Sequence, residues 1–517
     1  MSSTLSKVTN HQILQSVIIV AGCLFAAYAG NYIAEENYFP IAAALGGLLL
    51  IMFFFGLGSN VYLLIPICWG LNGQISALPL PFSVRQLVIL LASVLFISGL
   101  IFKTGRHKAI FESIDLWIWI NLFWLATTFS RNPVGVAALG GSERVGGKAY
   151  LDVLLGVMAY LMISRFRISE KDANRLPILI LSIAAFTSFA GAVGLFAPGV
   201  GNLLSYFYSD FGSGTFSDEV DSTISAGATR FGFLLAIGLQ LPLYIVCKTN
   251  PIKLILPHNI WRLLVYIIGI IMLFLTGFRN GVIQIFIITV VAALLREKWA
   301  GVAKIMLATC SVALISILIS YTSIQLPYSF QRTLSFLPGN WDQEAVRDAK
   351  GSSEWRFEMW KIVLTTDKYI HNKMLGDGFG FLRADFEIAV DAMMRGTQAY
   401  EGENAAQETF MIDGDVHSGP VSSIRFVGYI GLVLFLPLLF MQAAYSYRVI
   451  NASRGTPYEM LSLYLGIPSM TLPLIFIFVF GDFRTDFVII LFNVGMMKMI
   501  RSSVEGWKVL RYPQAGT

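Results

Sequence analysis

The sequence predicts an all-α, polytopic integral membrane protein with one long extracytoplasmic loop. Of the 517 residues, 56% are hydrophobic and 13% are charged, and the mean hydropathy is +0.67. A soluble domain has roughly 25% charged residues, so this composition excludes an ordinary soluble protein. The hydrophobic residues also gather in long runs, which give about 14 transmembrane helices by the length that a membrane span requires.

The predicted helices form two groups, which a polar segment separates. The first group fills residues 1–320, with spans near 13–34, 39–56, 58–73, 86–103, 111–130, 145–164, 175–197, 228–247, 261–277, 279–296 and 302–320. The second fills residues 420–517, with spans near 421–445, 458–480 and 483–501. A re-entrant pair fits residues 39–73 as well as two spans do. Residues 321–419 form the loop, so we predict two membrane domains and one loop domain.

The distribution of Lys and Arg predicts the orientation of the chain. These residues gather in alternate connections, near 103–108, 165–175, 248–262 and 296–304, and again in the C-terminal tail. Connections rich in Lys and Arg stay in the cytoplasm, so both termini are predicted there. The loop 321–419 then faces the periplasm of a bacterial inner membrane. Because that side has no ATP, a transfer reaction there needs an activated donor that has already crossed, such as a lipid-linked one.

Histidines and cysteines are few, so few residues are candidates for catalysis or metal binding. All four cysteines, Cys23, Cys68, Cys247 and Cys310, fall in apolar runs without a CxxC spacing, so neither a disulfide framework nor a zinc site is indicated. Three histidines, His11, His107 and His258, lie near predicted cytoplasmic helix ends, which leaves His371 and His417 on the outer side.

His417 is the better candidate of these two histidines. It precedes a predicted span by a few residues, and Asp413 and Asp415 are close enough in sequence to orient its imidazole. The alternative is a solvated histidine at the start of a helix.

Arginines at the outer ends of the spans form the second group of candidates. Arg230 begins a span, and Arg279 interrupts the apolar sequence between two spans. Both could bind phosphate with two parallel hydrogen bonds, and the alternative is snorkelling to lipid headgroups. Arg425 lies about two helical turns beyond His417 and could share its face, or could pair with a buried carboxylate.

The loop contains an amphipathic pattern and a glycine-rich turn. Ser353-Glu-Trp355-Arg356 and Trp360 have the apolar spacing and serine cap of an amphipathic helix, whose aromatic face we expect on the membrane. The segment Leu375-Gly-Asp-Gly-Phe-Gly-Phe381 could cradle an anion with its backbone amides, although such a segment is more often a simple turn.

In this order the motifs resemble those of the O-antigen ligase and polymerase superfamily, over roughly residues 228–445. Thr276-Gly-Phe-Arg279-Asn-Gly resembles the family's Thr-Gly-Ser-Arg-Gly turn, and the Arg356 helix resembles its loop helix with Arg and Trp. Leu375-Gly-Asp-Gly resembles its Leu-Leu-Gly-x-Gly segment, and His417 before Gly428-Tyr-Ile-Gly431 resembles its His-Asn sequence before the next helix. Phe278, Asn280 and Ser418 depart from the family pattern.

The resemblance implies a membrane glycosyltransferase of GT-C-like architecture that works without a metal or another cofactor. Its donor would be an undecaprenyl-diphosphate-linked glycan, and its acceptor a glycan or the lipid A core. Membrane lipids and other polysaccharide assembly proteins are the remaining partners, and no nucleic acid is expected. His417 would be the base that activates the acceptor hydroxyl. Arg279, with Arg230, Arg356 and Arg425, would bind the pyrophosphate.

Several functions stay open at this point. A polymerase joins two lipid-linked repeats, whereas a ligase moves the chain to lipid A core. The long loop favours the polymerase, since it could cover a groove for a growing chain. A transporter or flippase would place its ionisable groups near the membrane midplane, whereas these cluster at helix ends and in one loop. A non-catalytic scaffold is the third alternative.

Overall fold

A computed structural model describes most of the chain. The described residues are 61–76, 82–101, 111–133, 147–212, 231–322, 324, 326–380 and 410–511. The chain divides into one unit of residues Met1–Val61 and a second of Tyr62–Thr517, and the description below concerns the second. The predicted spans near 13–34 and 39–56 lie outside the described residues, and so does Arg230.

The regular structure of the described residues is helical, apart from an isolated bridge between Gln74 and Ser83. Six helices are long and apolar enough to cross a membrane. These are α7 (Glu170–Phe196), α11 (Ile260–Leu275, whose apolar stretch begins at Pro257), α12 (Arg279–Ser320), α17 (Gly419–Ser453), α18 (Glu459–Phe478) and α19 (Phe483–Arg511). The prediction of an all-helical integral membrane protein is confirmed, and the count of about 14 spans and the GT-C-like architecture stay predictions.

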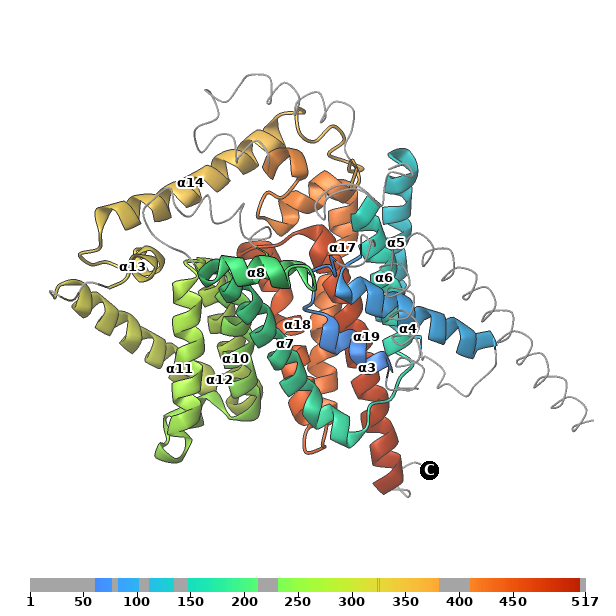
Figure 1. Cartoon of the computed structure of the whole chain (residues 1–517), viewed down its shortest axis with the longest axis horizontal. Coiled ribbons are helices and arrows are strands. Elements are labelled where there is room, and N and C mark those ends of the chain that lie inside the picture. Colours follow the sequence, from blue (N-terminus) through green and yellow to red (C-terminus); the bar gives the residue numbers. More distant parts are fainter. Residues whose placement is uncertain are drawn as a thin grey trace, which may run out of the picture. The chain divides into compact units, whose positions relative to one another are not determined.

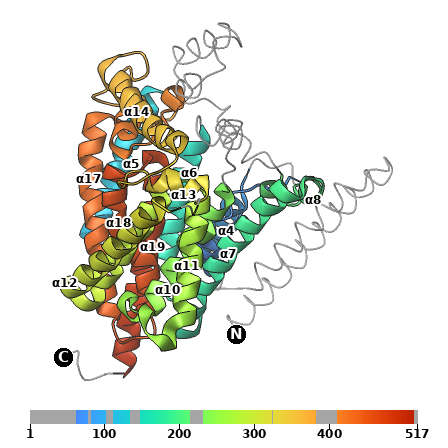
Figure 2. The same ribbon diagram turned by 90° about the vertical axis from the view of Figure 1, so that its left-hand side faces the viewer.

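The remaining described helices are shorter or less apolar. They are α3 (Val61–Cys68), α4 (Val84–Ile101), α5 (Ser113–Arg131), α6 (Gly147–Ile163), α8 (Pro198–Leu204), α10 (Leu235–Lys248), α13 (Tyr328–Leu334) and α14 (Gln343–Thr365), with 3-10 turns at Ser209–Phe211, Gly232–Leu234, Pro251–Ile255 and Pro257–Asn259. The spans predicted near 279–296 and 302–320 are merged in α12, which bends at Lys298. Helix α14 lies across one end of the bundle (Figures 1 and 2), which we call the site end.

Helix α17 connects several other helices of the bundle. It contacts α5, α18 and α19, and α19 also contacts α6. Phe483, Phe487 and Leu491 of α19 are buried. Lys498 is also buried and lies 2.5 Å from Asp115, whereas Arg501 is partly exposed and lies 2.6 Å from Glu112. The buried charge of Lys498 therefore has a partner, as the low dielectric of this region requires.

Helix α17 is broken at Gly428, whose φ of 74° is in the left-handed region. Residues 371–379, the latch segment, fill this break. The N–H groups of Asp377 and Gly378 donate to the carbonyls of Arg425 and Phe426, at 2.9 and 3.0 Å. In return the N–H groups of Tyr429 and Ile430 donate to carbonyls of the latch segment, at 2.8 and 3.2 Å.

Side chains of α5 complete the hydrogen bonding around the break. The indole of Trp124 donates to the carbonyl of Val427 at 2.8 Å. The guanidinium of Arg131 donates to the carbonyls of Leu375 and Gly376 in the latch segment, at 2.7 and 3.3 Å. A broken helix is stable in a membrane protein where other groups satisfy the freed backbone groups, and here the latch segment and α5 do so.

Two glycines allow the latch segment and α17 to approach closely. A Cβ added to Gly376, whose φ is 78°, would lie 2.5 Å from backbone atoms of Val427 and Gly428. A Cβ added to Gly428 would lie 2.3 Å from the carbonyl oxygen of Met374. Neither position can therefore hold a side chain without separating the two segments.

We expect Gly376→Ala to lower stability more than Gly455→Ala does. Both residues have a positive φ, so both variants carry the left-handed strain of about 1–2 kcal/mol. Gly455 has open space around it, whereas a methyl group at Gly376 overlaps backbone and adds about 1–3 kcal/mol. Thermal unfolding of both purified variants in detergent measures the difference. Equal losses would show that the close approach contributes nothing.

Candidate active site

His417 lies just before α17 at the site end, in a ring of aromatic side chains. Its ring centroid is 4.8 Å from that of Phe410, 5.2 Å from that of Phe480 and 6.3 Å from that of Trp355. The side chain keeps 19% of its surface exposed. The imidazole is thus shielded from bulk water and is still open on one side, which suits a group that exchanges a proton with a substrate.

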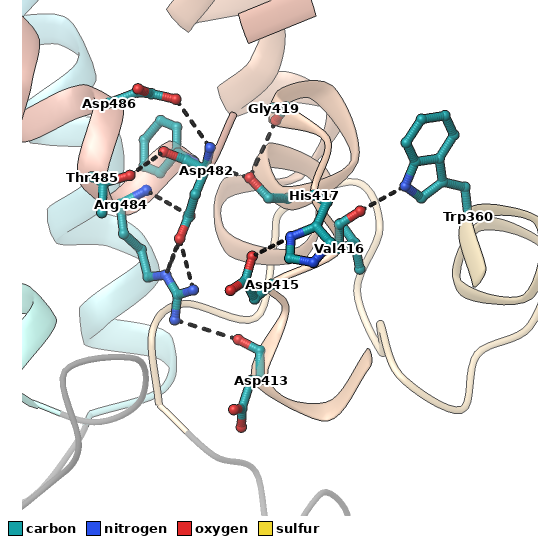
Figure 3. Close-up of polar contacts among 12 residues, drawn as sticks. Trp360, Asp413, Asp415, Val416, His417, Gly419, Asp482, Arg484, Thr485 and Asp486 are labelled. Carbon is teal, nitrogen blue, oxygen red and sulfur yellow. Dashed lines mark hydrogen bonds and ion pairs between the residues drawn. The ribbon is translucent and has the colours of Figure 1, made fainter. Parts of the chain in front are cut away.

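Asp415 is the charged neighbour of this imidazole. Its Oδ1 lies 3.3 Å from Nδ1 of His417, as Figure 3 shows. Nδ1 is buried and makes no hydrogen bond with the described residues. A carboxylate on the Nδ1 side leaves Nε2 as the nitrogen available to a substrate.

The backbone at His417 is strained. Its φ is 55°, a conformation that few side chains other than those of Asn, Asp or His adopt. Such strain costs about 1–3 kcal/mol and concentrates at functional sites. Gly414, with a φ of 73°, lies three residues earlier. The segment therefore turns twice before α17 begins, and the second turn presents the imidazole.

A second charged cluster joins this region from the connection between α18 and α19. The guanidinium of Arg484 donates to Asp482 at 2.7 and 3.0 Å and to the carbonyl of Asp413 at 3.4 Å. It also lies 4.5 Å above the ring of Phe426. The N–H of Asp482 donates to the carboxylate of Asp486 at 3.0 Å (Figure 3). Through these contacts the cluster supports the segment that carries His417.

Burial raises the pKa of the Asp482 carboxyl above its ordinary value. Arg484 opposes this rise, and the carboxylate of Asp415 adds to it. Our sequence prediction did not include Asp482, Arg484 or Asp486. The signal was present, because residues 481–486 hold three charged residues between two apolar spans on the predicted outer side, and such residues are usually functional.

Three arginines gather beside α14. Arg279 is the first residue of α12, Arg332 lies on α13 and Arg356 on α14. Arg279 donates to the hydroxyl of Ser353 at 3.2 Å. Burial, followed by the charges of Arg279 and Arg332, lowers the pKa of Arg356 below its ordinary value. Nε of Arg356 is buried and has no hydrogen-bond partner among the described residues. The cluster therefore concentrates positive charge, and the N-terminus of α12 adds its dipole.

Neighbouring residues of α14 connect the two parts of the site. Trp355 contacts the ring of His417, and Arg356 interacts with Arg279 and Arg332. Trp360 also reaches the histidine segment, because its indole donates to the carbonyl of Val416 at 2.7 Å. Helix α14 therefore contacts both the segment that holds His417 and the arginine cluster.

The structure corrects two details of the predicted loop helix. Helix α14 begins ten residues earlier than Ser353, and its cap is Asp342, which accepts from the N–H groups of Glu344 and Ala345. Ser353 is an interior residue of the helix. Trp355 and Trp360 pack on the buried cluster around Met411 and Val416 rather than on lipid. The apolar spacing is real, but the protein itself provides the surface that covers it.

Arg425 and the glycine-rich segment have structural partners. Arg425 is buried and donates to Asp377 of the latch segment at 2.6 Å. This is the pairing with a buried carboxylate that the sequence left open. The amides of Gly376, Asp377, Gly378 and Phe379 all donate within the protein, so the segment is a turn that holds α17. His371 belongs to the same segment, with Nδ1 3.7 Å from Asp377.

The fold and site thus define an integral membrane protein with a partly buried histidine and a cationic cluster at one end. Residues 264–436 match the family model described as O-antigen ligase. Over this segment the resemblance to the O-antigen ligase and polymerase superfamily is confirmed. The matched residues include Arg279, Arg356 and His417 but not Asp482 or Arg484. No curated protein matches the chain. The family supports an enzyme that acts on lipid-linked glycans.

We expect Arg484→Gln to destabilise the protein more at about pH 8 than at about pH 5. Arg484 opposes the rise in the pKa of Asp482, so its loss moves that pKa further above the value in the unfolded chain. Stability is then lost as the pH rises through the interval between these values. An ionised Asp482 that is buried without its partner costs about 3–5 kcal/mol. Thermal unfolding at both pH values measures the loss.

The control is Arg347→Gln, which removes an exposed arginine of α14 and should leave the thermal stability unchanged at both pH values. A loss that is the same at both pH values would contradict the assignment to Asp482.

Proposed function

We propose that the protein is a membrane glycosyltransferase that joins lipid-linked repeat units into a polysaccharide. The donor is an undecaprenyl-diphosphate-linked glycan, the acceptor is a sugar hydroxyl, and the site end faces the periplasm. The observation that carries the proposal is the placement by α14 of His417 and the arginine cluster in one region of a chain that matches the O-antigen ligase model.

His417 accepts the proton of the acceptor hydroxyl in this proposal. A sugar hydroxyl is a poor nucleophile at neutral pH, and a general base nearby removes its proton as the new bond forms. The oxygen then attacks the anomeric carbon of the donor sugar. The bond between that carbon and the phosphate oxygen breaks, and the lipid diphosphate leaves with the bonding electrons. Asp415 stabilises the imidazolium that results.

Arg279 and Arg356 bind the diphosphate. Negative charge grows on the leaving group as the bond breaks, and fixed cations directed at that position stabilise the transition state in a site that excludes water. The buried Nε of Arg356 without a partner fits a missing phosphate oxygen. Arg230 stays a proposed binder outside the described residues. Arg425 contributes by holding the latch segment and α17 together.

A ligase would use the same chemistry with lipid A core as the acceptor. We favour the polymerase because the segment from residue 321 to 419 is long and its helix α14 covers the site end. Purified protein offered the lipid-linked oligosaccharide alone, or with lipid A core, distinguishes the two. Growth of the oligosaccharide supports a polymerase, transfer to the core supports a ligase, and no product with either acceptor would reject both.

We expect His417→Ala to reduce transfer by about a hundredfold to ten-thousandfold, the usual contribution of a general base. Donor binding and thermal stability should change little, since Nδ1 of the imidazole makes no hydrogen bond within the described part of the protein. Product formation by the purified variant measures the effect. The control is His371→Ala, which should stay active because Asp377 is held mainly by Arg425 and by backbone N–H groups.

We expect Arg279→Lys to lose most of the activity and to fold normally. Lysine keeps the charge but lacks the planar fork that binds two phosphate oxygens. The matched control is Arg347→Lys, the same substitution at an exposed arginine of α14. Kinetics with varied donor concentration measure both variants. Full activity in Arg279→Lys would mean that the charge alone matters at this position.

A further inference from the structure

Arg332 has a different environment from the other two arginines of the cluster. It is buried, with 6% of its surface exposed, whereas Arg279 and Arg356 are partly exposed. Its Nε lies 2.6 Å from Oδ2 of Asp348, and its Nη2 lies 3.5 Å from Oδ1 of the same carboxylate. Its Nη1 donates to the carbonyl of Gly277 at 2.8 Å. The guanidinium is therefore already engaged by protein groups on both of its edges.

These contacts connect three separate elements. Arg332 lies on α13, Asp348 on α14 and Gly277 in the turn between α11 and α12. Gly277 precedes Arg279 by two residues and has a φ of 69°, so its carbonyl is part of the turn that directs Arg279. Asp348 lies two helical turns before Arg356 on α14, which places both residues on one side of that helix.

Tyr328 supports the same carboxylate. Its hydroxyl donates to Oδ2 of Asp348 at 3.2 Å. Burial and the charge of Asp348 raise the pKa of Tyr328 to about 12, so the hydroxyl keeps its proton and remains a donor. Two residues of α13, Tyr328 and Arg332, therefore bind the carboxylate of Asp348, and these contacts hold α13 against α14.

We propose that the Arg332–Asp348 pair is a positioning device that holds Arg279 and Arg356 at the spacing the lipid diphosphate requires. Arg332 acts through the Gly277 turn on one side and through Asp348 on the other, and it does not itself bind phosphate. The proposal rests on the proposed function, because the diphosphate is the ligand of that site. Ion pairs that orient binding residues are commonly as important as those residues, since an error of about 1 Å can cost about a hundredfold in rate.

Two roles for Arg332 make opposite predictions for Asp348→Asn. If the pair positions the other arginines, the variant loosens α13 from α14 and weakens anion binding. If Arg332 is a phosphate ligand that Asp348 holds back, the variant frees a cation and strengthens binding. The sign of the change therefore separates the roles, and the variant keeps a side chain of nearly the same shape.

The experiment measures binding of undecaprenyl diphosphate to the purified full chain in detergent, together with the kinetics of transfer. We expect Arg332→Lys and Asp348→Asn each to raise the Kd about tenfold or more, and the KM for the donor with it, because both disturb the same geometry. At saturating donor the turnover should fall much less. The Kd of the double variant should not exceed that of the single variant that binds more weakly, as expected for two residues that act as one unit.

The matched control is Arg347→Lys, on the same helix and exposed, which should leave the Kd unchanged. Tighter binding by Asp348→Asn, an unchanged Kd in either single variant, or additive losses in the double variant would each overturn the proposal. Thermal unfolding identifies a variant that fails to fold. If Arg332→Lys fails to fold, Asp348→Asn alone tests the proposal. A wild-type protein that binds undecaprenyl diphosphate but forms no product would reject the proposed function and leave this test intact.

Discussion

The break in α17 at Gly428 is the constraint on which the site depends. A continuous helix would carry the carbonyls of Arg425 and Phe426 within its own ladder, but here the latch segment takes them. Unpaired backbone groups are costly in a membrane protein, so the break exists only where a second segment can fill it. The ion pair between Arg425 of α17 and Asp377 of the latch segment also holds the two segments together through their side chains. The start of α17, and with it His417, is thereby set at a defined angle to the bundle.

Helix α14 converts this local constraint into a site. One part of it packs on the segment that holds His417, through Trp355 and Trp360. The other part meets the start of α12 through Ser353 and Arg356. In the proposed function, the base and the cation cluster act on the two ends of one transfer, so their separation matters. Because both contact α14, one element sets that separation.

Hydropathy predicted the helices well because membrane spans differ strongly from loops in composition. Helices α10, α11, α17 and α18 lie where the sequence placed spans. The contacts of the site could not be predicted in the same way. The pair of Asp377 with Arg425 joins residues 48 apart, and the pair of Arg332 with Gly277 joins residues 55 apart. No local periodicity encodes such contacts. The same limit explains why Arg332 was missed, since its partners Asp348 and Gly277 lie 16 and 55 residues away. Arg484 differs, because its partner Asp482 is two residues away and the local charges were a usable signal.

The distribution of charge separates the arginines by role. Arg425 and Arg484 are each paired with a carboxylate, Asp377 and Asp482, so the removal of either arginine mainly exposes a buried acid. Arg356 has cationic neighbours instead, and the charges of Arg279 and Arg332 add to burial in lowering its pKa. Repulsion of this kind persists in a folded protein only when something outweighs it. In the proposed function, binding of the diphosphate would relieve this repulsion, so that part of the binding free energy would come from the cluster itself.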